Sequence, residues 1–125
     1  MSTDYSKMSD FEINGLIAKH TQKVGDFIQS RGLTFIHEYG KPVSGFGALC
    51  LGWKEFDPCN NPADAWPIIA ENRIGIIPAP CYGEWKAAHR SVGDDSTPHH
   101  FTQHTNPLRA AMIVFLKMQE SKNAS

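Results

Sequence analysis

The sequence predicts an α+β fold, in which an antiparallel sheet of about four to five strands is packed by three helices, in one domain over residues 1–125. Helix-start signals recur at Ser9, Asn61 and Asn106, and segments rich in Phe, Ile, Leu and Gly lie between the first two. A chain of 125 residues has a common single-domain size and can bury a core without metals or disulfides.

Composition excludes several classes of protein. With 41% hydrophobic and 20% charged residues and a net charge of −1, the chain is an ordinary globular one, and we expect no binding of duplex nucleic acid. The apolar run "AAMIVFL" is too short to span a membrane and is flanked by Arg109 and Lys117. The polar start "MSTDYSKMSD" is neither a signal nor a transit peptide, and the three cysteines form no Cys-x-x-Cys. We therefore expect a cytoplasmic protein with free thiols.

The first helix is predicted from Ser9 to about His20. Ser9 and Glu12 have the spacing of a capping box, with Asp10 also placed where the helix dipole favours an acid. The helix would bury Phe11 or Ile13 together with Leu16 and Ile17.

Residues 24–53 predict two or three strands, with turns at Arg31-Gly32 and at Gly40-Lys41-Pro42. Gly45, Gly47 and Gly52 lack the spacing of a dinucleotide fingerprint or a phosphate-binding loop. We interpret these glycines as bulges or close backbone approaches.

Two later helices begin with the same pair of residues. Asn61-Pro62 and Asn106-Pro107 each place an asparagine at the N-cap and a proline at the first helical position. The first of these helices would end at Glu71-Asn72, and Pro67 predicts a 3₁₀ first turn or a slight kink. The second would reach about Gln119. Its run Ala110 to Leu116 is apolar nearly all round, so it should pack under a sheet or against another subunit, and we expect a homo-oligomer, most simply a dimer.

Between these helices, residues 74–90 predict a β-hairpin that turns at Pro78 to Gly83. Alternation on the return strand places Trp85, Ala87 and His89 on one face. Lys86, Ala88 and Arg90 would lie on the other. The segment "SVGDDSTPHH" is expected to be a polar loop.

The two Asn-Pro starts suggest an anion site, because a helix start leaves backbone N–H groups at the positive end of the dipole. Arg109 stands in the first turn of the last helix, where the dipole disfavours a cation, so it is a candidate phosphate or carboxylate clamp. The alternative is a structural ion pair between Arg109 and an acid such as Asp57, Asp64 or Glu71.

Aromatic and basic residues alternate in the middle of the chain, a mixture that suits a nucleotide-like ligand. Tyr82 belongs to this group, whereas Trp66, among alanines and isoleucines, is expected in the core. The expected ligand-binding residues are Arg109, Asn106, Asn61, Arg73, Trp85, Lys86, His89, Arg90, His104 and Trp53.

Catalytic and metal-binding interpretations have less support. His99, His100 and His104 precede the last helix, with a helical spacing between the second and third, but zinc would need Cys59, Cys81 or His89 as further ligands and no paired spacing supplies them. Cys59 lies just before a helix start, yet nothing fixes a base beside it. We expect no catalytic residue, no metal and no cofactor.

Three blocks, "SDFEIN", "CNNPADAWPIIAEN" and "NPLRAAMIVFL", resemble the NinX-like family of small bacteriophage and prophage proteins. The resemblance implies a phage accessory protein without an established catalytic activity, in the cytoplasm of an infected or lysogenic bacterium. Together with the anion site and the aromatics, it suggests that the protein sequesters a small anionic nucleotide-derived molecule, such as an immune signal. The alternative function is an interaction module that binds a host or phage protein through a flat apolar surface.

Overall fold

A computed structural model of the chain describes residues 3–40, 47, 49–90 and 100–123. The described strands form two three-stranded antiparallel sheets, in the orders β1-β2-β3 and β4-β5-β6. The α+β class is confirmed, but two sheets take the place of the expected single sheet of about four to five strands. In chain order the elements are η1 (Tyr5–Lys7, a 3₁₀ turn), α1 (Asp10–Thr21), β1 (Phe27–Ser30), β2 (Leu33–Tyr39), β3 (Cys50–Glu55), α2 (Pro62–Glu71), β4 (Gly75–Pro78), β5 (Trp85–His89), β6 (His100–His104) and α3 (Pro107–Asn123).

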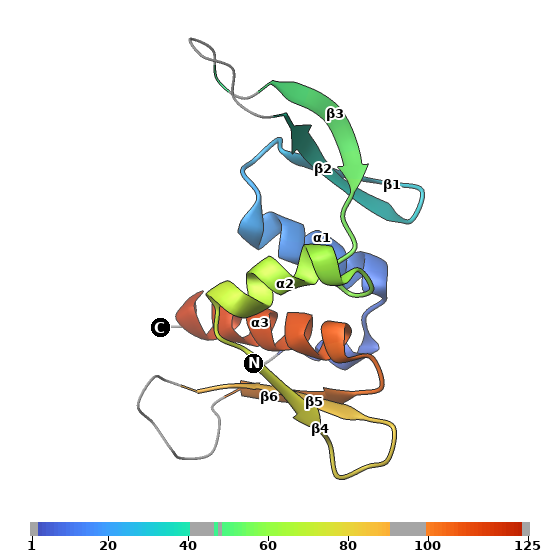
Figure 1. Cartoon of the computed structure of the whole chain (residues 1–125), viewed down its shortest axis with the longest axis vertical. Coiled ribbons are helices and arrows are strands. Elements are labelled where there is room, and N and C mark those ends of the chain that lie inside the picture. The colour runs from blue at the N-terminus through green and yellow to red at the C-terminus, as the bar shows by residue number, and fades with distance from the viewer. Residues whose placement is uncertain (1–2, 41–46, 48, 91–99, 124–125) are drawn as a thin grey trace.

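The elements are stacked in layers (Figure 1). The first sheet lies on α1, α1 and α2 lie on one side of α3, and the second sheet covers the other side of α3. A helix that is apolar nearly all round needs cover on opposite sides, and one sheet can cover only one of them. Every residue from Ala110 to Leu116 is buried within this single chain. This run therefore gives no reason to expect a second subunit.

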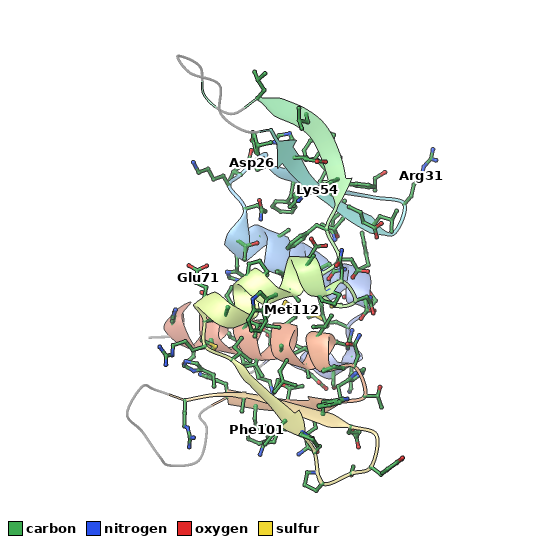
Figure 2. All side chains as sticks on the ribbon, viewed as in Figure 1. Asp26, Arg31, Lys54, Glu71, Phe101 and Met112 are labelled. Atoms are coloured by element: carbon green, nitrogen blue, oxygen red, sulfur yellow. The ribbon has the colours of Figure 1, made fainter. Side chains whose placement is uncertain are left out.

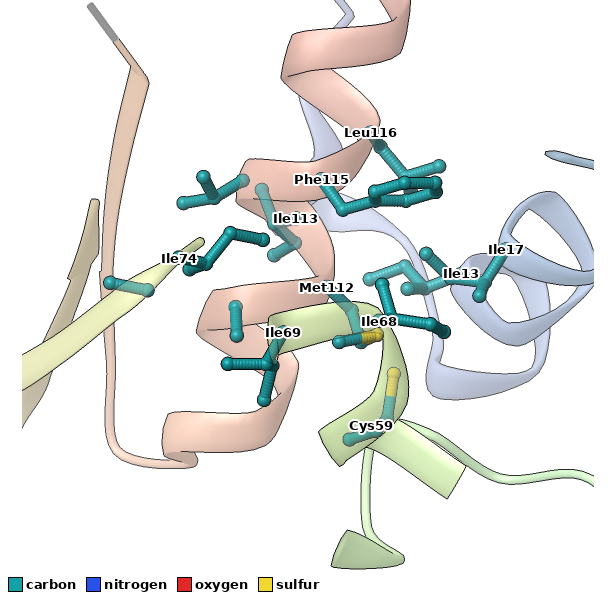
Figure 3. Packing of buried hydrophobic residues seen from close by; sticks show 14 of the residues in the cluster. Ile13, Ile17, Cys59, Ile68, Ile69, Ile74, Met112, Ile113, Phe115 and Leu116 are labelled. Carbon is teal, nitrogen blue, oxygen red and sulfur yellow. The ribbon is translucent and has the colours of Figure 1, made fainter. Parts of the chain in front are cut away.

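The hydrophobic core is built around α3 (Figure 3). Met112, Phe115 and Leu116 face the helices, where they meet Ile13 and Ile17 of α1. Side chains from α2 and from the chain around it complete the cluster; they are Cys59, Ala65, Ile68, Ile69 and Ile74. Phe11 and Leu16, expected in the core, are half-buried.

The helix-start signals are confirmed. The Ser9 hydroxyl accepts a hydrogen bond from the N–H of Glu12 (3.1 Å), and the Glu12 carboxylate accepts one from the N–H of Ser9. Asn61 caps α2 by accepting from the N–H of Ala63 at 3.0 Å. α2 is α-helical from Pro62 through Pro67, so the expected 3₁₀ first turn does not form.

The first sheet contains the predicted turn at Arg31-Gly32, where both residues have positive φ. The register between β2 and β3 shifts after Glu38, opposite Gly52, whose φ is 126°. The bulge expected at a glycine is thus confirmed at Gly52. Of the turn predicted at Gly40-Lys41-Pro42, only Gly40 is described, and its N–H donates to the carbonyl of Leu49. Lys41, Pro42 and Gly45 lie outside the described residues.

The hairpin of β4 and β5 is confirmed, with Ala79 and Glu84 paired across its turn. The strand β6, His100–His104, was not expected: it pairs antiparallel with β5, so the helical spacing inferred for His100 and His104 is wrong. Alternation along "HFTQH" is too short and too polar to stand out in sequence. The polar loop at 91–99 is not among the described residues.

Candidate functional site

The two Asn-Pro starts meet each other rather than a ligand. The side-chain N–H₂ of Asn106 donates to the backbone carbonyl of Cys59 (2.7 Å) and to the Asn60 side chain (3.1 Å), just before α2. Its carbonyl oxygen accepts from the N–H groups of Leu108 (3.0 Å) and Arg109 (3.3 Å). The N–H groups that were expected to bind an anion at the start of α3 are therefore used in capping.

Arg109 is buried, with 6% of its surface exposed, and holds the start of the chain against α3. Its guanidinium donates to the Asp10 carboxylate (2.6 Å), to the carbonyl of Met8 (2.6 Å) and, less closely, to that of Tyr5 (3.4 Å). The observed geometry is that of the alternative prediction, a structural ion pair of Arg109. The acid, however, is Asp10 and not Asp57, Asp64 or Glu71.

The lowered pKa of Asp10 is consistent with its pairing with Arg109. Burial acts to raise the pKa of Asp10, but hydrogen bonds from Asn60 and Arg109 outweigh it and hold the pKa below its ordinary value of 3.8. Among the described residues, the Nε of Arg109 has no hydrogen-bond partner. This nitrogen is buried and so is shielded from solvent.

A second set of hydrogen bonds extends the contact. Asn14 of α1 donates to the Asp57 carboxylate (2.8 Å) and accepts from the N–H of Cys59 (3.2 Å), and Asp64 accepts from the N–H of Asp57. The residues that join α1, α2 and α3 in this way are called the polar junction; they are Asp10, Asn14, Asp57, Asn60, Asn106 and Arg109. Every side chain of the junction makes at least one hydrogen bond to another part of the chain, so we assign the junction a structural role.

The aromatic and basic residues of the second sheet are divided between its two faces. In register with β4 and β6, Trp85 lies opposite Pro78 and His104, on the same face as the buried Ala87. Lys86 lies on the other face, where its ammonium group is 4.9 Å from the centre of the Phe101 ring. Phe101 points away from the helices (Figure 2).

The expected ligand-binding residues are therefore dispersed. His89 shares the face of Trp85, and Arg90 follows it at the end of β5. Arg73 is exposed just after α2, and Trp53 is in the first sheet, on the far side of the helices. Asn61 caps α2 without taking part in the polar junction. The structure brings Trp85 near His104 and joins Asn106 to Arg109, but it does not gather the set into one site.

The prediction for Trp66 is wrong. It was expected in the core, but 64% of its surface is exposed, because the buried face of α2 is formed by Ala65, Ile68 and Ile69. In a helix, Trp66 and Ala65 point in different directions, so its apolar neighbours in sequence do not cover it.

One hollow of about 350 Å³ lies between η1 and the second sheet. Tyr5, Thr102 and Lys117 line it, together with Thr3, Asp4, Ser6, Phe101, Gln103 and Ile113. None of the expected ligand-binding residues is among them. The Lys117 ammonium group already donates to the carbonyl of Phe101 at 2.9 Å.

The first sheet carries a surface that the sequence analysis missed. Its inner face, with Phe27, Thr34 and Ile36, packs on α1. Its outer face presents apolar and aromatic side chains that no described helix covers. We call this surface the aromatic face; it consists of Ile28, Leu33, Phe35, His37, Tyr39 and Trp53.

Register explains how these side chains come together. Ile28 pairs with Phe35, and His37 pairs with Trp53, with ring centroids only 4.0 Å apart. Tyr39 lies with its ring edge toward His37 at 5.9 Å. Trp53 is 43% exposed and Tyr39 52%. Every second residue from Leu33 to Tyr39 is apolar or aromatic, and that period of two is the signal that could have revealed the face.

Cys59 is buried, and burial raises the pKa of its thiol to about 12. A thiol that remains protonated at neutral pH is not a nucleophile, so the structure gives no support to covalent chemistry at Cys59. Within the described ranges, no three His, Cys, Asp or Glu side chains assemble into a group that could hold a metal ion. His99, one of the residues considered for zinc, lies outside those ranges.

Among the described residues, no helix is both long and apolar enough to cross a bilayer.

The structure defines a small α+β protein with a polar junction between its helices and an aromatic sheet face that no described helix covers. The chain belongs to the family described as bacteriophage P22 NinX, whose model matches residues 4–119, and the resemblance found in the sequence is confirmed. No curated protein and no solved structure matches it.

Proposed function

We propose that this chain is a non-catalytic phage accessory protein of the bacterial cytoplasm that binds another protein through the aromatic face. The observation that carries the proposal is the outer surface of the first sheet, where Trp53, Tyr39 and Ile28 are each exposed by more than 40%. Large contiguous apolar surface outside a pocket is typical of a protein-binding site. Tryptophan and tyrosine are also the side chains most often found to dominate binding energy at protein interfaces.

The expectation that the protein sequesters a small anionic nucleotide-derived molecule has less support. It required charged residues in a concave pocket, together with aromatics. Arg109 is paired with Asp10, and the candidates Trp85 and Lys86 point to opposite faces of β5. The hollow beside η1 contains none of these residues.

Capture of the partner in cells tests the proposal. The tagged protein would be expressed in the host bacterium during phage infection, cross-linked and recovered, and the proteins bound to it identified. A partner bound by the wild type should be lost in Trp53→Ala and retained in Trp66→Ala. Both tryptophans are exposed, but Trp66 lies on α2, away from the aromatic face.

Calorimetry with the purified partner gives the quantitative result. Loss of a central tryptophan should cost about 2 kcal/mol or more, which weakens binding at least tenfold. Equal affinities of the two variants would overturn the proposal. Binding of a member of a nucleotide panel at about micromolar affinity, together with no protein partner, would return support to the sequestration hypothesis.

A further inference from the structure

Acidic side chains border the aromatic face on both sides. Asp26 continues β1 beside His37, since the N–H of His37 donates to the Asp26 carbonyl and the Asp26 carboxylate lies 3.3 Å from the His37 Nδ1. Glu55 lies on β3 directly opposite Phe35, so its side chain shares this face. The two edge strands thus each contribute one carboxylate.

The cations of the first sheet lie elsewhere. Lys54 pairs with Ile36 and therefore belongs to the face that packs toward α1, and Arg31 projects from the tip of the β1–β2 turn (Figure 2). Within the described strands β1, β2 and β3, no lysine or arginine shares the aromatic face. A ligand lying across this face would meet aromatic rings in the middle and negative charge on both sides.

From this charge pattern we propose that the aromatic face binds an extended segment that contains proline and carries lysine or arginine. This inference rests on the proposed function and names the chemistry of the partner. Proline-rich segments dock on aromatic side chains because their polyproline II helix is already formed and loses little entropy on binding. The lysine or arginine side chains would pair with Asp26 and Glu55.

Hydrogen-bond donors at the face fit such a ligand. A polyproline II segment has no internal hydrogen bonds, so its carbonyl groups are free to accept. Trp53 is 43% exposed, and its indole N–H is a hydrogen-bond donor. Tyr39 carries an O–H at the surface, 3.4 Å from the His37 Nδ1. Both can donate to carbonyl groups of the segment.

The rings are held in place before any ligand arrives. His37 is packed on Trp53 with an angle of 33° between the rings and meets Tyr39 at 80°, so the surface is stepped rather than flat. The contact between His37 and Asp26 fixes the ring from the side of β1. A preformed surface lowers the entropic cost of binding.

Three labelled peptides of equal length test the inference with the whole purified chain. The first contains proline and arginine, the second has glutamate in place of arginine, and the third keeps arginine but has alanine in place of proline. Affinity would be measured by fluorescence anisotropy. We expect the first peptide to bind at least tenfold more tightly than either of the others, and binding to weaken as salt rises.

Variants locate the site. Trp53→Ala should weaken binding of the first peptide at least tenfold, and Asp26→Asn combined with Glu55→Gln should remove most of its preference over the glutamate peptide. Trp66→Ala should bind as the wild type does. Circular dichroism and unfolding curves would show that each variant is folded.

Equal binding of the three peptides, or equal loss in Trp53→Ala and Trp66→Ala, would overturn the inference. If no peptide binds while Trp53→Ala still abolishes capture of a protein partner, the proposed function stands and the ligand class assigned here is wrong. If instead the chain proves dimeric and Trp53→Ala makes it monomeric, the face binds a second copy, which would also contradict the inference.

Discussion

Replacement of Arg109 by alanine tests whether the polar junction holds the fold or is a binding site. The change removes two hydrogen bonds of 2.6 Å from a charged donor, one to Asp10 and one to the carbonyl of Met8. Each is of a kind that contributes about 1.5–3 kcal/mol. Asp10 is partly exposed and can be hydrated after the change, whereas the carbonyl group of Met8 is left without this donor.

Because the Asp10 carboxylate is 43% exposed, its share is at the low end of that range, and we expect a total loss of about 2–4 kcal/mol. A domain has a total stability of about 5–15 kcal/mol, so Arg109→Ala should leave the protein folded but much less stable. Arg109→Lys keeps the charge, but one ammonium group replaces a fork that reaches both Asp10 and Met8, so we expect an intermediate loss.

Urea unfolding followed by circular dichroism measures both variants against the wild type. The double-mutant cycle with Asp10→Asn then separates the pair from its surroundings. If Arg109 instead stands ready to bind an external anion, its removal should relieve an unsatisfied buried charge and raise the stability of the free protein. An unchanged or increased free energy of unfolding in Arg109→Ala would refute the structural assignment.

Three further predictions concern single side chains. The folded-state pKa of Asp10 is lowered, so its contribution to stability is present above about pH 4 and is lost as the pH falls through the folded-state pKa. The difference in unfolding free energy between wild type and Asp10→Asn should therefore shrink from about pH 5 to about pH 2. A difference that stays constant would contradict the pairing. Arg73 has a φ of 55° just after α2, where glycine is favoured, so Arg73→Gly should raise the unfolding free energy by about 0.5–1 kcal/mol in a urea titration, and a loss of stability would argue for a contact of its side chain. Cys50 and Cys81 are exposed and Cys59 is buried. A thiol reagent at about pH 8 should therefore modify two thiols in the native protein and the third only after unfolding. Rapid modification of all three would show that the core opens readily.

Local features of the fold were predictable because their causes are local. The capping box of Ser9 and Glu12 and the asparagine caps each depend on residues within three positions of one another. The hairpin of β4 and β5 depends on a short turn between alternating segments. These patterns leave one dominant conformation, so the helix starts and the hairpin are where the sequence places them.

Long-range partners were not predictable in the same way. The acid that pairs with Arg109 lies 99 positions earlier, and the acids nearer in sequence were the natural candidates. The prediction of a single sheet was wrong. The apolar run of α3 shows that this helix is covered on all sides, but it does not show how many layers of helices and sheets provide the cover. Trp66 was misplaced since neighbours in sequence on a helix do not share a face. The aromatic face needed the register of three strands, and a bulge at Gly52 makes that register hard to infer.

The central position of α3 has a consequence for synthesis of the chain on the ribosome. Both halves of the core are built on α3, which follows every other described element in the sequence. While the earlier residues emerge, the sides of α1, α2 and the second sheet that face α3 in the folded chain have nothing to pack against. Domains in which early segments pack with each other can begin folding during translation. Here α1 and the first sheet can pack on each other early, but the packing of α2 and the second sheet around α3 must wait until α3 has left the ribosome. A product that stops before Pro107 would expose the apolar side chains of those elements to cellular proteases.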